Sequence, residues 1–163
     1  MKKTSKNILQ IESPVGIIEL RENHNALVEL VFTHITTDHH LPKINMQKPE
    51  SVLERAAREL SEYFEGKRQK FGIPLRPSGT PFQTKVWKKL QEARYGETLS
   101  YKNLAESASI KNGARAVGSA MKSNPIPIFI PCHRVLKSDG SLGGFSSGLH
   151  IKKFLLSLET RQR

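Results

Sequence analysis

The segment from Asn124 to Val135 restricts the fold of this chain more than any other stretch, because three of its residues are proline. Proline fixes its own φ and biases the preceding residue toward extended backbone, so the segment cannot form a helix. A stiff apolar run therefore leads into Cys132, the only cysteine of the sequence, and His133. A lone cysteine is most often a small buried apolar residue. Here the imidazole and Arg134 favour a reactive thiol, because nearby positive charge lowers the pKa of a thiol from about 8.5.

The residues around this segment resemble the active-site region of the O6-alkylguanine-DNA alkyltransferases, also called methylated-DNA–protein-cysteine methyltransferases. The resemblance covers residues 80–159, about half of the chain. Its members, in order, are Tyr101, Ala114-Arg115-Ala116-Val117-Gly118, Asn124-Pro125, Pro131-Cys132-His133-Arg134-Val135 and Leu155-Leu156-Ser157-Leu158-Glu159. The resemblance implies that Cys132 removes an alkyl group from damaged guanine and keeps it.

Length and charge suggest two small domains, of which the second carries the chemistry. The 163 residues have a net charge of +11, and this charge is unevenly distributed. Residues 1–76 hold 12 Lys and Arg against 10 Asp and Glu, whereas residues 77–163 hold 14 against 5. Extra lysines can simply maintain solubility, but a basic half with a helical DNA-binding pattern favours a nucleic-acid partner. No apolar run is long enough to span a membrane, and no secretory signal follows Met1, so we expect a cytoplasmic protein.

The first half of the sequence predicts a small antiparallel sheet covered by one helix, and the resemblance implies a ribonuclease H-like domain over residues 1–76. Residues 8–12, 16–21 and 26–32 have the composition of short strands separated by turns. Ser51 begins a helix as half of a capping box with Glu54. The apolar stripe predicted for this helix comprises Val52, Leu53, Ala56, Ala57, Leu60 and Phe64. Residues 71–79 are predicted to form the interdomain linker.

Three histidines, His34, His39 and His40, raise the hypothesis of a metal site. We reject it, because no cysteine and only Asp38 among acidic residues lies near them. Animal members of the resembled family carry a cysteine-containing zinc site in this region. The sequence lacks those cysteines, so we expect neither a metal nor another cofactor.

The second half predicts a helical, winged helix-turn-helix-like domain over residues 77–163, giving an α+β protein overall. Thr80 begins a helix that runs to about residue 93 and buries Phe82. Helices over 101–108 and 114–122, joined by a Gly-containing turn, fit a helix-turn-helix, with an ordinary helical hairpin as the alternative. The second of these helices is rich in small residues and can approach a DNA backbone closely. A glycine- and serine-rich loop over 142–148 precedes a last helix, over 149–159.

The resemblance implies a role for each matching residue. His133 takes the thiol proton through a water, Glu159 orients His133, and Asn124 braces the turn before Cys132. Arg115 fills the gap left by a flipped nucleotide while its helix lies in the minor groove. The implied guanine pocket comprises Tyr101, Val135, Phe145, Ser146 and Ser147, and the further DNA contacts comprise Ala114, Gly118, Lys122 and Ser138. Some relatives carry tyrosine at the position of Phe145 and many carry glycine at that of Ser147.

The expected activity is single-turnover repair of O6-alkylguanine in double-stranded DNA by a monomer, and the sequence leaves open whether O4-alkylthymine is also accepted. One alternative is a non-catalytic DNA-binding lesion sensor or regulator, which the presence of Cys132 disfavours. Another is a cysteine hydrolase, which would require turnover and a base placed for deacylation.

Overall fold

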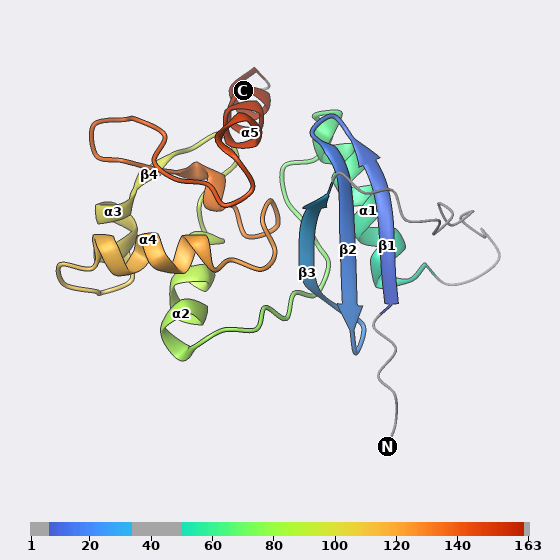
Figure 1. Cartoon of the computed structure of the whole chain (residues 1–163), viewed down its shortest axis with the longest axis horizontal. Helices are drawn as coiled ribbons and strands as arrows, with labels where there is room; N and C mark the ends of the chain where they lie inside the picture. Colours follow the sequence, from blue (N-terminus) through green and yellow to red (C-terminus); the bar gives the residue numbers. More distant parts are fainter. Residues whose placement is uncertain (1–6, 34–49, 162–163) are drawn as a thin grey trace. The chain divides into compact units, whose positions relative to one another are not determined.

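The structure, a computed structural model, describes residues 7–33 and 50–161, and the chain divides into two compact units between Pro77 and Ser78. Among these described residues, the first unit contains a small antiparallel sheet and one helix, and the second unit is mainly helical (Figure 1). This arrangement confirms the predicted α+β class. In the described residues, no helix combines the length and apolar character that a bilayer crossing requires. The histidines considered for a metal site lie in 34–49, outside the described residues.

The sheet of the first unit is an antiparallel meander of β1 (Asn7–Ser13), β2 (Gly16–Asn23) and β3 (Ala26–Thr33), as predicted. His24 and Asn25 both have positive φ, which matches the twist that a two-residue turn between β2 and β3 requires. The register aligns apolar side chains on one face, pairing Leu20 with Leu9 on one side and with Leu30 on the other. This face carries the core of the unit.

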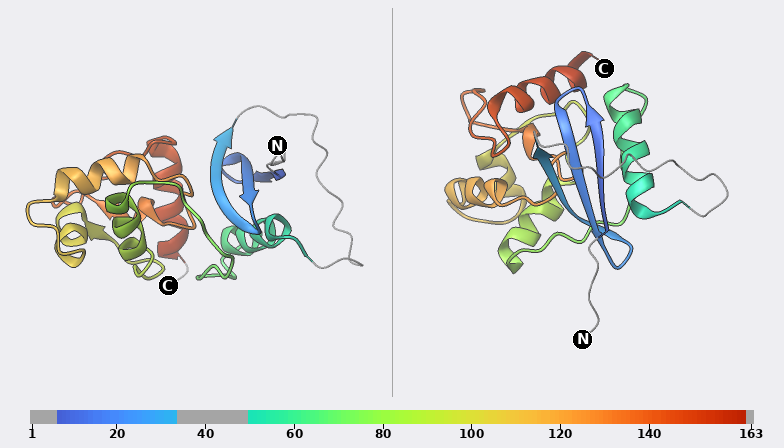
Figure 2. Two further views of the ribbon diagram at one scale, coloured as in Figure 1. Left: turned by 90° about the horizontal axis from the view of Figure 1, so that it is seen from below. Right: turned by 45° about the vertical axis from the view of Figure 1, so that its right-hand side comes forward.

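Helix α1 (Val52–Phe64) packs against the sheet (Figure 2) and begins with the predicted capping box. The Ser51 hydroxyl accepts the Glu54 N–H at 3.2 Å, and the Glu54 carboxylate accepts the Ser51 N–H at 2.7 Å. Two residues of the predicted stripe, Ala57 and Phe64, are only half-buried, and Tyr63 is buried instead.

The reason for this difference is a buried carboxylate on α1. Glu59, which is 3% exposed, accepts the backbone N–H of Gly72 at 2.8 Å. The returning chain therefore covers the side of α1 that holds Glu59 and Tyr63, rather than the side that holds Ala57. Part of the predicted linker also belongs to the first unit. Leu27 pairs with Leu75, donating to Pro74 O at 2.9 Å and accepting from Arg76 N at 2.8 Å, so this stretch extends the sheet edge.

The second unit contains four helices and a short parallel strand pair. The elements are α2 (Pro81–Leu90), β4 (Leu99–Ser100), α3 (Tyr101–Ser107), α4 (Ala114–Lys122), the 3₁₀ turn η1 (Cys132–Arg134), β5 (Val135–Leu136) and α5 (Leu149–Arg161). Strands β4 and β5 bring the segment after η1 beside the start of α3. Helix α4 has the bounds that the sequence predicts, whereas α2 ends three residues earlier and α5 ends two residues later.

Trp87 anchors α2, because its indole N–H donates to Ala120 O on α4 at 2.9 Å. Thr80 is the N-cap of this helix, as predicted, and it forms a capping box with Gln83. The predicted burial of Phe82 is wrong, because this side chain is 38% exposed. The main chain at Gly79 covers the Trp87 ring instead, so closely that an added Cβ would lie 2.5 Å from it.

Helices α3 and α4 form the predicted helix pair joined by a short turn. Ser100 caps α3 by accepting the Asn103 N–H at 3.0 Å. The turn uses positive φ at Ser109 and Asn112, and Gly113 precedes α4. The inward side chains of the pair are apolar: Leu104, Ala105, Val117, Ala120 and Met121. The opposite side of α4 exposes Arg115.

Candidate active site

Cys132 lies at the start of η1, at the end of the proline-containing segment, and its side chain is 5% exposed. Ile128 has φ +73°, a conformation that a β-branched residue rarely adopts. The backbone closes tightly around this residue, because Ile130 N donates to Ile126 O at 2.9 Å and Cys132 N donates to Ile130 O at 2.7 Å. These backbone hydrogen bonds therefore fix the position of Cys132 at the end of a tight turn.

Asn124 holds this turn with both ends of its side-chain amide. Its oxygen accepts the Ile126 N–H at 3.0 Å, and its nitrogen donates to Ile130 O at 2.9 Å. The same nitrogen donates to Cys132 Sγ at 3.1 Å. Asn124 thus positions the backbone before the cysteine and also contacts the sulfur itself.

Glu159, on α5, binds the residues that follow the cysteine. Its carboxylate lies 2.7 Å from His133 Nε2 and accepts from Arg134 Nε at 2.9 Å and from Nη2 at 3.0 Å. It also accepts the Gly96 N–H at 3.0 Å. Burial opposes the charge of Glu159, but the hydrogen bonds from His133 and Arg134 outweigh it and lower the pKa of this carboxyl to about 2. The carboxylate is therefore ionised at neutral pH.

The ionised Glu159 fixes the tautomer of His133. A carboxylate only accepts hydrogen bonds, so Nε2 carries the ring proton and Nδ1 is the acceptor. Nδ1 is buried and has no hydrogen-bond partner within the part of the chain that the structure describes. Burial also lowers the pKa of His133, against the raising effect of Glu159, so the ring is a neutral base with a free lone pair.

The prediction that neighbouring charge gives Cys132 a low pKa is wrong. Burial dominates and raises the pKa of this thiol to about 11, although Asn124 and Lys152 act in the opposite direction. Arg134 does not assist, because its guanidinium is bound to Glu159 and, at 2.7 Å, to Ala93 O. The resting group is consequently a thiol, and a base is needed to remove its proton.

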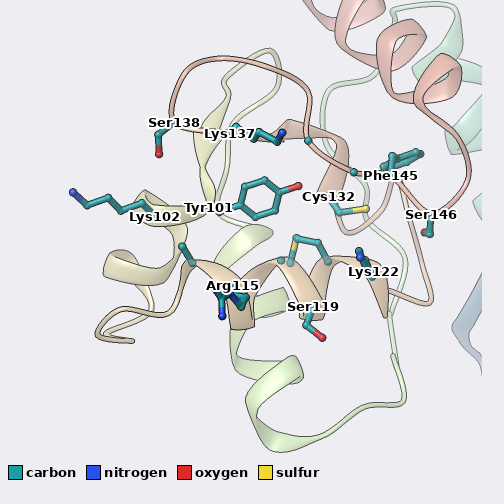
Figure 3. Close-up of a pocket in the computed structure, with 15 residues that line it drawn as sticks. Tyr101, Lys102, Arg115, Ser119, Lys122, Cys132, Lys137, Ser138, Phe145 and Ser146 are labelled. Atoms are coloured by element: carbon teal, nitrogen blue, oxygen red, sulfur yellow. The ribbon is translucent and has the colours of Figure 1, made fainter.

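Cys132 lines a cavity of about 560 Å³ between α3, α4 and the loop before α5 (Figure 3). Tyr101, Cys132 and Phe145 reach this cavity from three different segments. Gly143, with φ +66°, lets the loop approach Tyr101, because a Cβ there would lie 2.8 Å from the tyrosine hydroxyl. The remaining lining residues are Lys102, Ala114, Arg115, Gly118, Ser119, Met121, Lys122, Lys137, Ser138, Gly144 and Ser146.

Most of the predicted site residues line this cavity, whereas five of them do not. His133, Glu159 and Asn124 are buried, and of these Asn124 contacts Cys132 Sγ. Val135 is buried in β5, and Ser147 lies in the turn closed by the Gly148 N–H to Phe145 O bond. Gly118 faces Tyr101, from whose ring an added Cβ would be 3.8 Å away.

Several lining residues were not predicted from the sequence, and two of them are lysines. Lys102 and Lys137 join Arg115 and Lys122 at the cavity, where no described lining residue is acidic. The basic composition of residues 77–163 indicated such a surface but could not locate it. The sequence analysis also missed Lys152, a fully buried lysine on α5.

Comparison with known proteins gives a consistent result over both units. Residues 81–161 match the family model of the 6-O-methylguanine DNA methyltransferase DNA-binding domain, and residues 10–77 match that of its ribonuclease-like domain. The chain is 48% identical to a methylated-DNA–protein-cysteine methyltransferase of Methanosarcina barkeri, over 91% of this chain and 94% of that protein. The constitutive enzyme of Bacillus subtilis is 38% identical, over 91% and 92% of the two chains.

Solved structures agree with these sequence matches. The crystal structure of Mycobacterium tuberculosis O6-methylguanine methyltransferase has a TM-score of 0.81 and 34% identity, covering 96% of this chain and 94% of that one. A structure of the same protein in complex with DNA also has a TM-score of 0.81, with 36% identity over 95% and 93% of the two chains. The chain therefore belongs to the methylated-DNA–protein-cysteine methyltransferase family.

Proposed function

We propose that this chain repairs DNA by transferring the alkyl group of O6-alkylguanine to Cys132. The observation that supports the proposal is that the Cys132 thiol lines the cavity, and that the next residue, His133, is buried and bonded through Nε2 to Glu159. A thiolate is a strong nucleophile toward an alkyl carbon. In the reaction a bond forms between Sγ and the alkyl carbon while the bond from that carbon to guanine O6 breaks.

Proton movement follows from the tautomer of His133. Its Nδ1 accepts the thiol proton through a water, as the resemblance implies, and its Nε2–H remains bonded to Glu159. The resulting imidazolium is stabilised by the adjacent carboxylate, as in a nucleophile, base and acid triad. The leaving guanine takes up one proton from solvent while the His133 imidazolium releases its proton to solvent, and the Tyr101 hydroxyl is the proposed hydrogen-bond donor to the guanine.

The product is a thioether, which has no easy leaving group. Each protein molecule therefore accepts one alkyl group and does not turn over. No cofactor is required by this chemistry, because the alkyl group itself is the only group transferred.

The proposed DNA partner is a duplex with the damaged nucleotide rotated out of the stack, because a nearly buried thiol cannot reach O6 within the helix. Helix α4 enters the minor groove with Ala114 and Gly118 at the close approach, and Arg115 occupies the vacated space. Lys122 and Ser138 contact phosphates. Minor-groove insertion of this kind is used by proteins that kink or open DNA.

The flipped base stacks on Phe145 in the proposed pocket. Ser146, Ser147 and Val135 complete the surroundings of this base. We further infer a monomer that acts in the cytoplasm, where a reducing environment keeps Cys132 as a thiol.

Intact mass spectrometry tests the proposal with duplex DNA containing one O6-methylguanine. We expect the protein to gain the mass of a single methyl group at a one-to-one limit. Cys132→Ala is expected to bind the same duplex and gain nothing, because the nucleophile is missing. Full transfer to Cys132→Ala, or many equivalents of DNA repaired per protein, would refute the mechanism.

A further inference from the structure

Ser119, on α4, is a polar residue at the cavity that takes no part in the transfer chemistry. It lies four residues after Arg115 and three before Lys122, a spacing that places the three side chains on one face of the helix, and all three line the cavity. Figure 3 shows Arg115 and Ser119 projecting from the same side of α4. The face of α4 that carries two proposed DNA contacts therefore also carries a hydroxyl.

The Ser119 side chain is half-buried, and its hydroxyl has no hydrogen-bond partner among the described residues. A serine or threonine inside a helix commonly donates to the carbonyl four residues earlier. Ser123 donates in this way to Ser119 O at 3.2 Å, and Thr160 on α5 donates to Leu156 O at 2.8 Å. The hydroxyl proton of Ser119, in contrast, is available to an acceptor outside the chain.

The floor of the DNA minor groove offers acceptors to such a donor. An A·T pair presents only adenine N3 and thymine O2 there, whereas a G·C pair adds the N2 amino group of guanine, which is itself a donor. Four residues of α-helix span about 6 Å and a base-pair step is about 3.4 Å, so a helix in the groove places Ser119 within about two base pairs of Arg115. A hydroxyl at this position can distinguish A·T from G·C pairs next to the lesion.

We propose that Ser119 is a specificity-determining residue, whose hydroxyl donates to adenine N3 or thymine O2 in the minor groove beside the lesion. Lesions flanked by A·T pairs are then repaired faster than lesions flanked by G·C pairs. The effect on repair rests on the proposed function. The contact with the groove concerns any duplex, and it is measurable without methyl transfer.

The test compares Ser119→Ala with the unmutated chain on three duplexes that differ only in the two base pairs on each side of one O6-methylguanine. These pairs are A·T, G·C or inosine·C. Inosine lacks the N2 amino group, so its pair with cytosine resembles A·T in the minor groove and G·C in the major groove. Ser107→Ala is the matched control, because Ser107 is exposed on α3 and its hydroxyl donates to Leu104 O at 2.9 Å. Alanine is the best helix former, so Ser119→Ala preserves α4.

The measured quantity is the ratio of single-turnover transfer rates, on the A·T or inosine·C duplex relative to the G·C duplex, at DNA concentrations below saturation. We expect this ratio to be about three- to tenfold lower in Ser119→Ala than in the unmutated chain, which is the effect of one hydrogen bond. Ser107→Ala should keep the parental ratio. Comparing variants on the same duplexes removes the easier opening of A·T and inosine·C pairs from the result. An unchanged ratio in Ser119→Ala, or an inosine·C duplex that follows G·C, overturns the proposal.

Fluorescence anisotropy with lesion-free duplexes of alternating A·T, G·C or inosine·C pairs measures the groove contact without transfer. The corresponding ratio of affinities should also fall in Ser119→Ala. If the unmutated chain takes no methyl group from any duplex while these affinities shift as expected, the proposed function fails and the groove contact remains. If methyl transfer occurs but the ratio of rates is unchanged, the proposed function stands and the role of Ser119 is overturned. Neither transfer nor a shift in affinity would overturn both.

Discussion

Glu59 in the first unit and Glu159 in the second are both buried carboxylates, but their partners differ in kind. Glu59 accepts a backbone N–H from Gly72 and lies 3.7 Å from Arg68, at the edge of the unit. Glu159 receives hydrogen bonds from His133, from Arg134 and from the Gly96 N–H. The first carboxylate holds the returning chain at Gly72, whereas the second binds the two ionisable side chains that follow Cys132 in sequence. Burial of an acid is therefore not informative about function until its partners are known.

The largest expected effect is on the rate of methyl transfer, and it distinguishes the two carboxylates when each is replaced by glutamine. Glu159→Gln should slow methyl transfer by about 100-fold or more, because His133 loses the charge that stabilises its protonated form. Glu59→Gln should leave the rate per folded molecule unchanged. Single-turnover transfer to the protein, measured with duplex DNA and with free O6-methylguanine base, checks both variants.

Glu159→Gln should slow transfer from free O6-methylguanine as much as transfer from duplex DNA, because the defect lies in the activation of the Cys132 thiol by His133. Removing the partner of the buried Arg134 also destabilises the fold by about 3–5 kcal/mol, so rates are normalised to the folded fraction from circular dichroism. A parental rate in folded Glu159→Gln, or an equal loss in Glu59→Gln, would remove the distinction between the two carboxylates.

A smaller effect is expected at the surface of the second unit. Arg115→Ala should slow transfer from duplex DNA by about 10- to 100-fold, because the flipped state loses the side chain that fills the stack. Free O6-methylguanine should react at close to the parental rate. Lys85→Ala, an exposed lysine on α2, is the charge-matched control. Equal slowing of free base and duplex by Arg115→Ala would assign Arg115 to the pocket or the fold.

The smallest effect is a difference in acid stability between the units. The pKa of Glu159 is lowered, so its contribution is present above its ordinary pKa of about 4.5 and is lost as the pH falls toward about 2. The pKa of His133 is also lowered, so protonation of the unfolded chain weakens the fold below about 6.5. Hydrogen exchange at decreasing pH should show the segment around η1 opening before the β1–β3 sheet. Simultaneous opening, or earlier opening of the sheet, would contradict this assignment.

Local signals in the sequence were sufficient for most of the elements. Ser51, Thr80 and Ser100 cap their helices because a side-chain oxygen at such a position satisfies a nearby backbone N–H, and this depends on neighbours in sequence alone. The family and the rigid turn before Cys132 were equally predictable, since the prolines and the ordered motifs around this residue are all local. Phe82 was misassigned because the main chain at Gly79 takes the place against Trp87 that an apolar side chain would otherwise occupy.

The charge interactions of the site could not be predicted from local sequence signals, because they depend on residues that are far apart in the sequence. Arg134 is two residues after Cys132 in sequence but is bound to Glu159, which is 25 residues further along the chain. Lys152 follows the buried Ile151 and precedes the exposed Lys153, so its position in α5 gives no sign of burial. The burial of Lys152 becomes evident only in the structure, where carbonyls of β5 and of the loop before α5 accept hydrogen bonds from its Nζ.

The hydrogen bond between His133 and Glu159 also sets the order in which the site can be completed during synthesis. The carboxylate follows the imidazole by 26 residues and lies on the last described helix, so it leaves the ribosome after the nucleophile and its base. A nascent chain that ends before α5 contains Cys132 and His133 but has neither the fixed tautomer nor the buried cation of Lys152. The hydrogen-bonded arrangement around His133 is consequently complete only when the second unit is translated through α5.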